Sequence, residues 1–188
     1  MTDLYLVRHG QTEWSRDGRH TSATDLELTE VGRREAERLR DRLADLQPGL
    51  VLSSPRRRAL DTARIAGFPA EQVEVTEDLA EWGYGDYEGI TSEEIRERDP
   101  GWTVWTHPTP GGETPAQVRE RLGRVVERVR GSGLDRVLCF GHGHSLRALT
   151  LIWLELDLER GESFPMETGT LSVLGERKGR PALVHWNS

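Results

Sequence analysis

The chain has 188 residues and a formal net charge of −7 at neutral pH. This length suits one domain with a sizeable core, so we expect a single domain over residues 1–188. The acidic balance argues against nucleic acid and anionic membranes as partners, because both favour broadly basic protein surfaces.

Cys139 is the only cysteine, so the chain can form neither an intrachain disulfide nor a Cys-based zinc site. Its place in an apolar run predicts a small buried side chain. The first residues lack the pattern of a signal peptide, and no apolar run approaches the ~18 residues of a membrane span. We therefore expect a cytoplasmic protein that does not enter a membrane.

The first apolar segment, residues 3–7, predicts a buried strand that ends at Arg8, His9 and Gly10. Arginine offers a planar fork of donors that suits phosphate, and a neutral histidine can act as a nucleophile. Glycine lets a ligand approach the backbone closely. Ligand sites in open α/β sheets lie at the carboxyl ends of strands, so these residues predict phosphate binding with covalent catalysis. The alternative is an ordinary strand end with two solvated side chains.

Loops, amphipathic helices and short strands alternate in the next part of the chain. Residues 15–27 lack a period and predict a loop at the mouth of the site. Thr29 is a suitable cap for a helix that runs to about Asp45. Residues 50–53 predict a buried strand, followed by a helix over 56–66 with Ser54 as its N-cap.

The middle of the chain predicts a third short strand at residues 73–75 and then a glycine- and aromatic-rich loop over 79–89. Thr91 with Glu94 has the pattern of a capping box for a short helix that ends near Pro100. Thr114 with Gln117 has the same pattern and begins a helix that ends at Gly131.

The last part of the chain repeats the layout of its beginning. The apolar residues 136–140 predict a central strand that runs into Gly141, His142 and Gly143, followed by a helix over 146–156. Two closing strands are expected at 170–174 and 182–186. This alternation predicts an α/β protein: a three-layer α/β/α sandwich with a mostly parallel central sheet.

Four polar segments each follow a predicted strand and are expected to share one pocket. In order and spacing they resemble the motifs of the histidine phosphatase superfamily, the group of cofactor-independent phosphatases and cofactor-dependent phosphoglycerate mutases. The matching motifs are Leu-Val-Arg-His-Gly-Gln-Thr-Glu-Trp at 6–14, Thr-Asp-Leu-Glu-Leu-Thr at 24–29, Ser-Pro-Arg-Arg-Arg-Ala-Leu-Asp-Thr at 54–62, Glu81 with Gly85 and Glu88-Gly89, Gly-Glu-Thr at 112–114, and His-Gly-His-Ser-Leu-Arg-Ala at 142–148.

This resemblance implies a phosphomonoester phosphatase in which His9 becomes phosphohistidine and Glu81 is first the general acid and then the base. Arg8, Arg58 and His142 hold the phosphoryl oxygens in the family, and no cofactor or metal is involved. The remaining phosphate- and substrate-side positions are Ser15, Thr21, Ser22 and Gly143. Ser15 stands where the family usually has Asn, and Ser22 stands where it commonly has Gly. Two arginines and a second imidazole can stabilise a phosphoryl group in transfer.

Cofactor-dependent phosphoglycerate mutase is the main alternative. Mutases are longer and carry an inserted segment that closes over the substrate, whereas residues 89–112 are short here. An open pocket admits water and ends the transfer in hydrolysis. The 81–89 loop and Trp102 with Trp105 look closest to the acid phosphatase and sugar-bisphosphatase branches.

Three further alternatives are weaker. A catalytically inactive phosphate-binding module would lack catalytic residues, yet every expected position is filled. A serine-hydrolase elbow at 143–147 fails at Arg147, where Gly is required. A metal site built from His9, His20, His142 and His144 would place arginines beside the cation.

Several neighbouring residues have two interpretations. Trp102 and Trp105 either line a pocket for a bulky substrate or anchor the core, which is the more common role of tryptophan. His144 either contacts substrate or supports the site from behind, and Glu88 is expected to orient its loop. Trp82 and Tyr84 flank Glu81 with apolar surface, which favours activity on the acid side of neutrality.

The partner is expected to be a small phosphorylated metabolite: a sugar phosphate, a nucleotide-derived monoester or a small phosphoacid. A homodimer is a common assembly in the family that the motifs resemble.

Overall fold

The computed structural model describes residues 2–188. In this range six strands form one sheet in the order β3-β2-β4-β1-β5-β6. The first four strands of this order are parallel neighbours, and β5 and β6 are antiparallel. The mostly parallel central sheet is therefore confirmed. The strands are β1 (Asp3–Arg8), β2 (Leu50–Ser53), β3 (Glu74–Val75), β4 (Arg136–Gly141), β5 (Leu171–Arg177) and β6 (Arg180–His185).

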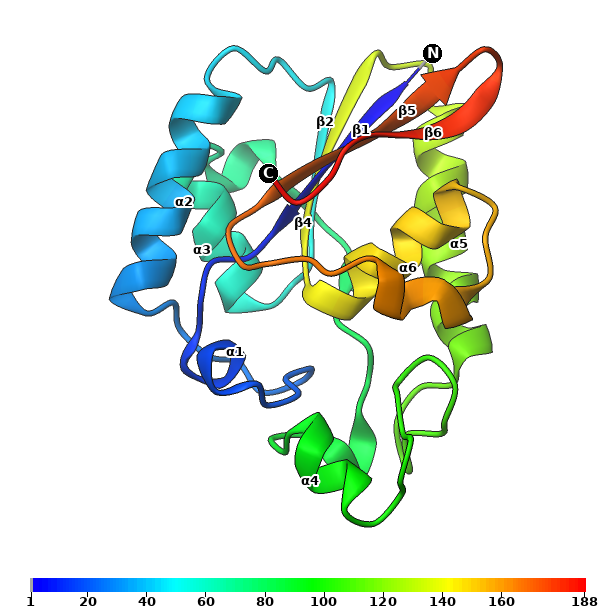
Figure 1. The fold of residues 1–188 in the computed structure, drawn as a ribbon. Coiled ribbons are helices and arrows are strands. Elements are labelled where there is room, and N and C mark those ends of the chain that lie inside the picture. The colour runs from blue at the N-terminus through cyan, green and yellow to red at the C-terminus, as the bar shows by residue number, and fades with distance from the viewer. Residues whose placement is uncertain (1) are drawn as a thin grey trace.

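Helices cover both faces of this sheet, which confirms the expected three layers. Figure 1 shows α2 and α3 on one face and α5 and α6 on the other. The α-helices are α1 (Glu13–Asp17), α2 (Glu30–Leu43), α3 (Arg57–Ile65), α4 (Ser92–Arg96), α5 (Pro115–Gly131) and α6 (Gly143–Trp153). Short 3₁₀ turns are η1 (Ala70–Gln72), η2 (Glu77–Leu79), η3 (Gly85–Tyr87) and η4 (Leu158–Ser163).

Two buried clusters fix these layers. One joins Val7 and Phe140 of the sheet to Leu39 of α2, and the other joins strand residues such as Leu6 to Val125 of α5. Because both faces of β1 and β4 are covered, these strands are continuous apolar runs rather than alternating ones.

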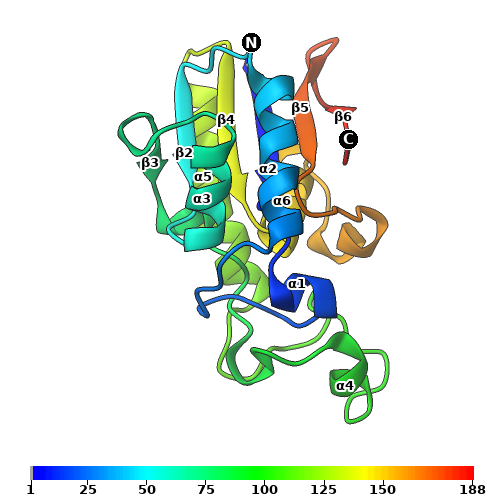
Figure 2. The same ribbon diagram turned by 90° about the vertical axis from the view of Figure 1, so that its left-hand side faces the viewer.

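The register of the parallel strands explains why the polar motifs meet. Arg8 at the end of β1 lies beside Gly141 at the end of β4, and Ser53 at the end of β2 lies beside Phe140. The segments that follow these strands leave the sheet at the same edge, the lower end in Figure 1. Helices α1 and α4 and their loops lie beyond this edge, as the side view of Figure 2 shows.

The capping predictions are confirmed for three helices. Thr29, Thr91 and Thr114 each accept a hydrogen bond from the backbone of their helix, and the last two form full capping boxes. Trp102 and Trp105 are buried in the core cluster, so the anchoring interpretation of both tryptophans holds. No helix of residues 2–188 has the length and apolar character that crossing a membrane requires.

Several local predictions were wrong: helix α4 ends at Arg96 and not near Pro100, and β5 and β6 extend to Arg177 and from Arg180, into the expected turn. Residues 15–17 are not part of the expected 15–27 loop but belong to α1, which Thr12 caps through a capping box with Ser15. Helix α3 begins one residue later than expected, with Arg56 and not Ser54 at its N-cap. Helix α6 begins at Gly143 instead of residue 146, because the extended backbone of His142 is its N-cap.

Candidate active site

A polar cavity of about 210 Å³ opens at the carboxyl ends of the central strands. Its lining includes six of the predicted site residues. The lining residues are Arg8, His9, Ser15, Gly18, Arg19, His20, Thr21, Glu81, Tyr84, Ser92, Gly143, His144, Arg147 and Met166.

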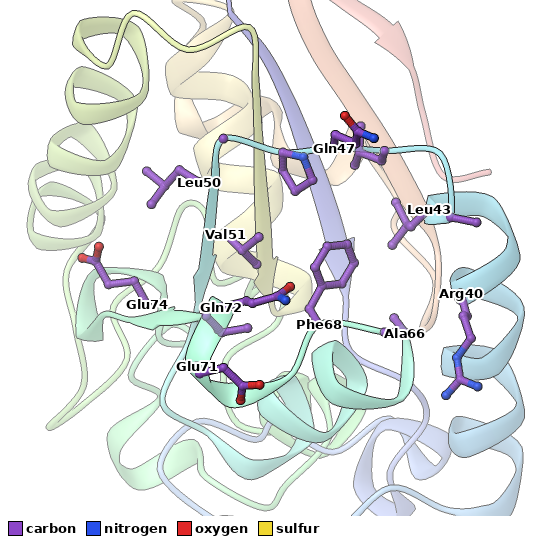
Figure 3. A pocket seen from close by; sticks show the side chains of 16 residues that line it. Arg40, Leu43, Gln47, Leu50, Val51, Ala66, Phe68, Glu71, Gln72 and Glu74 are labelled. Atoms are coloured by element: carbon purple, nitrogen blue, oxygen red, sulfur yellow. The ribbon is translucent and has the colours of Figure 1, made fainter.

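A larger cavity of about 840 Å³ lies elsewhere, beside the amino end of β2 (Figure 3). Leu43, Val51, Phe68 and Gln72 are among the residues that line it, and none of the predicted site residues does. The smaller cavity is therefore the candidate active site.

His9 is oriented by a backbone carbonyl. Its Nδ1 lies 2.7 Å from the carbonyl oxygen of Gly10, and because a carbonyl only accepts, Nδ1 carries the proton and donates it. The other ring nitrogen, Nε2, then holds the free lone pair. Burial, followed by the charges of Arg58 and Arg8, lowers the pKa of His9 well below 6.5. The ring is therefore neutral and nucleophilic at neutral pH.

His142 lies beside His9, with 5.2 Å between the ring centroids, but it is fully buried and bonded at both nitrogens. Arg58 Nε donates to its Nδ1 at 3.2 Å, which places the ring proton on Nε2. That nitrogen donates to Ser54 Oγ at 2.7 Å. Ser54 is thus a partner of His142, and its hydroxyl also accepts the Arg56 N–H at 3.3 Å, just before α3 begins.

Arg58 is fully buried behind His9, and it does not line the cavity. Besides His142, it donates to the carbonyl oxygens of Thr21, Ser22 and Thr24 at 2.9 to 3.2 Å. It therefore joins the 21–24 loop to the two histidines.

Arg8 reaches the cavity directly. One of its terminal nitrogens donates to the carbonyl oxygen of Met166, and within residues 2–188 its buried Nε has no partner. Gly143 allows this placement, because a Cβ at that position would stand 3.3 Å from Arg8 Cζ. Arg8 thus has donor capacity for an anion in the cavity.

Glu81 faces the same cavity from the 79–89 loop and is 8 % exposed. One carboxylate oxygen accepts the N–H groups of Trp82 and Ser145 at 2.8 and 2.7 Å, and the other accepts His144 N–H at 3.0 Å. Helix α6 therefore holds the carboxylate at its N-terminus, an arrangement that the start of α6 at Gly143 makes possible.

The other predicted residues have different surroundings. Ser15 and Thr21 line the cavity, although the Ser15 hydroxyl is already bonded to the backbone of Thr12. Ser22 does not line it: its hydroxyl and N–H bond to Glu88, which also accepts Thr24 N–H. Glu88 thus orients the loop, as expected from the sequence.

Four further cavity residues carry chemistry but are not among the predicted site residues: His20, Tyr84, His144 and Arg147. The buried Tyr84 hydroxyl, whose pKa is raised by burial and by Glu81, lies 2.6 Å from His144 Nδ1. Arg147 stacks on Trp105 at 4.9 Å. His144 and Arg147 are three residues apart on α6 and so share a helix face, which is the one sequence signal for their joint placement.

The four histidines considered as metal ligands do not form a cation site. Within residues 2–188, no group of three or more His, Cys, Asp or Glu side chains is arranged to hold a metal ion.

Known proteins resemble this chain over nearly its whole length. A model of the histidine phosphatase superfamily (branch 1) matches residues 4–188. An acid phosphatase of Mycobacterium tuberculosis is 45 % identical over 179 residues, which cover 94 % of this chain and 87 % of that protein. Sedoheptulose 1,7-bisphosphatase of Saccharomyces cerevisiae is 34 % identical, with 82 % of this chain and 68 % of the enzyme covered.

Solved structures resemble this chain over nearly its whole length as well. The product of an open reading frame of Mycobacterium tuberculosis superposes with a TM-score of 0.93 at 43 % identity, covering 99 % of this chain and 97 % of its own. The matched motifs, the shared fold and the two histidines at adjacent strand ends all support the same family. The chain belongs to the histidine phosphatase superfamily, branch 1.

Proposed function

We propose that the protein hydrolyses phosphomonoesters through a phosphohistidine on His9. The observation that carries this proposal is the fixed tautomer of His9, whose Nδ1–H is held by Gly10 while Nε2 is left free beside the cavity. Nε2 attacks phosphorus, an N–P bond forms, and the ester P–O bond breaks with its electron pair on the leaving oxygen. The enzyme is a phosphoric monoester hydrolase of the histidine phosphatase type.

Glu81 supplies and then removes a proton in this scheme. Its carboxylic acid protonates the leaving oxygen, so that an alcohol departs. The resulting carboxylate then takes a proton from water, whose oxygen attacks phosphorus. The N–P bond breaks, its electron pair returns to His9 Nε2, and inorganic phosphate leaves. Glu81 suits both steps because it lines the same cavity as His9.

The phosphoryl oxygens are held by cationic and neutral donors. Arg8 binds one side with its free donor capacity, and the Nε2–H of His142, bonded to Ser54 here, is the second donor. Arg58 aligns His142, and burial together with the charges of Arg58 and Arg8 keeps His9 neutral. Gly143, Ser15 and the loop that carries Thr21 and Ser22 shape the surroundings.

The substrate in this proposal is a small polar metabolite. A cavity of about 210 Å³ limits the organic part that can accompany the phosphoryl group. Its lining also includes Arg19, His20, Ser92 and Arg147, which are donors for hydroxyl or carboxylate groups. The sugar bisphosphatase and acid phosphatase among the relatives support this substrate class. We propose the cytoplasm as its compartment and a homodimer as its assembly.

One pair of assays tests this function. Phosphate release from p-nitrophenyl phosphate and from a panel of sugar phosphates, nucleotides and phosphoacids is followed with EDTA present, together with conversion of 3- to 2-phosphoglycerate. We expect EDTA-resistant release and little isomerisation.

The same assays are run on His9→Ala, which should lose phosphate release. The matched control is His185→Ala on the exposed outer strand β6, which should keep it. Isomerisation that outruns release would identify a mutase instead. Full loss of release in EDTA would refute metal-independent catalysis, and binding of phosphate without turnover would identify a binding module.

A further inference from the structure

An ion pair outside the cavity, Arg121 with Glu113, forms hydrogen bonds to the backbone of the loop that carries Glu81. Arg121, on the buried face of α5, is 9 % exposed. Its Nη1 donates to the carbonyl oxygens of Asp78 and Ala80 at 2.9 and 2.8 Å, and its Nη2 donates to that of Glu81 at 3.2 Å. Three carbonyl groups of residues 78–81 thus converge on one guanidinium.

Glu113 binds the remaining N–H groups of Arg121. Its carboxylate accepts Arg121 Nε and Nη2 at 2.7 and 2.8 Å, so the two side chains pair through two parallel hydrogen bonds. These bonds and the three carbonyl contacts use all five N–H groups of the guanidinium. Burial raises the pKa of Glu113, but the bonds from Arg121 and the Gly83 N–H outweigh it and leave the pKa below 4.5. Glu113 therefore stays ionised at neutral pH.

The backbone of Glu113 is also joined to the loop. Gly83 N–H donates to the Glu113 carboxylate, and Glu113 N–H donates to the Gly83 carbonyl oxygen, both at 2.8 Å. The indole N–H of Trp82 donates to the Glu113 carbonyl oxygen at 3.0 Å. The neighbouring Gly112 permits this approach, because a Cβ there would stand 2.1 Å from the Gly83 carbonyl oxygen.

Glu81 is consequently held from two directions. Helix α6 binds its carboxylate through the N–H groups of His144 and Ser145, and Arg121 on α5 binds its carbonyl oxygen. These two helices pack on the same face of the sheet (Figure 1). Residues 80–84 lie between the 3₁₀ turns η2 and η3, and the ion pair adds side-chain hydrogen bonds to the backbone of Ala80, Glu81 and Gly83.

We propose that Arg121 and Glu113 are positioning residues that set Glu81 at the distance needed for proton transfer to the leaving group. This inference rests on the proposed function of Glu81. A misplacement of about 1 Å in an active site can reduce a rate by about 10²-fold. Arg121 lies outside the cavity lining, so it acts on the reaction through Glu81.

The leaving group separates this role from a purely structural one. p-Nitrophenolate is a weak base and departs without a proton, whereas the alkoxide of glycerol phosphate requires one. The ratio kcat/KM reports the steps up to departure of the alcohol, so it isolates proton donation. Loss of position at Glu81 must therefore reduce kcat/KM for glycerol phosphate far more than for p-nitrophenyl phosphate.

The experiment compares Arg121→Gln with Arg124→Gln. Arg124 is on the same helix and also pairs with the loop, at 2.6 Å from the Asp78 carboxylate, but it is exposed and contacts no backbone carbonyl of residues 78–81. We expect Arg121→Gln to lower kcat/KM by about 10²-fold on glycerol phosphate and less than about 10-fold on p-nitrophenyl phosphate. Arg124→Gln should behave as wild type on both probes.

A double-substitution cycle completes the test. In a Glu81→Gln background, adding Arg121→Gln should cost little further on glycerol phosphate, because the group it positions is already gone. If Arg121→Gln does not fold, Glu113→Gln, which keeps the volume and an acceptor for Gly83, replaces it. Equal losses on both probes, or full additivity with Glu81→Gln, would overturn the proposal. If Glu81→Gln alone shows no contrast between the probes, the acid role of Glu81 itself is refuted.

Discussion

His9 and His142 lie at the ends of neighbouring parallel strands, each precedes a glycine, and their rings meet in a T-shaped arrangement. Their surroundings nevertheless differ. A backbone carbonyl binds one nitrogen of His9 and leaves the other free, whereas Arg58 and Ser54 occupy both nitrogens of His142. Similar strand ends thus produce one ring with a free nitrogen and one ring bonded on both sides, and this difference in hydrogen-bond partners is why we propose His9 as the nucleophile and His142 as a donor.

The largest effect should follow from His9→Ala, which removes the attacking atom. We expect phosphate release to fall by at least about 10⁴-fold, because loss of a nucleophile abolishes covalent catalysis. Steady-state assays on p-nitrophenyl phosphate measure this, with thermal unfolding to show that the variant is folded. Activity within about 10-fold of wild type would contradict the assignment of His9 as the nucleophile.

A smaller loss is expected for His142→Ala. It removes one of the proposed phosphoryl donors, and such a donor is worth about 10²–10³-fold in rate. It also leaves the buried Arg58 Nε and Ser54 Oγ without this partner, so unfolding free energy should fall by about 1–3 kcal/mol. Kinetics and urea unfolding measure the two effects. A loss equal to that of His9→Ala would indicate that both histidines act in the covalent step.

Alanine substitutions at the glycines after the two histidines should also lower stability by different amounts. A Cβ on Gly10 would stand 2.3 Å from the Gly32 carbonyl oxygen, a backbone atom of α2, so Gly10→Ala should cost about 1–3 kcal/mol of stability. A Cβ on Gly143 would press on the Arg8 side chain at 3.3 Å, which can move. Gly143→Ala should therefore raise KM and lower stability by less than about 1 kcal/mol. Denaturant unfolding of both variants tests the order, and the reverse order would contradict it.

The smallest effect concerns pH. Burial, Arg58 and Arg8 lower the pKa of His9, so the nucleophile stays neutral as the pH falls through 6.5, and kcat/KM on p-nitrophenyl phosphate should show no His9 limb there. Arg8→Gln removes one of these charges and should raise the pKa of His9, moving the acid limb towards pH 6.5. An NMR titration of the His9 ring in both proteins measures this, and an unchanged or lower pKa in Arg8→Gln would contradict it.

Much of the fold follows from the sequence because it depends on local patterns. The apolar runs before Arg8 and after Asp135 predict central strands, and the Thr91 and Thr114 boxes predict helix starts. The meeting of the polar motifs also follows, because parallel strands present their carboxyl ends together.

Features that depend on distant partners were missed. Ser54 looks like a helix cap, yet its hydroxyl binds a histidine 88 residues away. The start of α6 depends on the extended backbone of His142, and the grip of Arg121 on the 78–81 carbonyls joins segments about 40 residues apart. The aromatic neighbours of Glu81 were expected to define its surroundings, whereas its carboxylate is bound by the N-terminus of α6.

The most direct test is to locate the phosphoryl group during turnover. The enzyme is mixed with p-nitrophenyl phosphate, quenched in alkali, cleaved with trypsin and analysed by mass spectrometry. His9 falls in the peptide of residues 9–16, and His142 and His144 fall in that of residues 137–147. Phosphate on the 9–16 peptide, bonded to His9 Nε2, is the predicted result. Phosphate on the 137–147 peptide, or turnover with no labelled histidine at any quench time, would contradict the account.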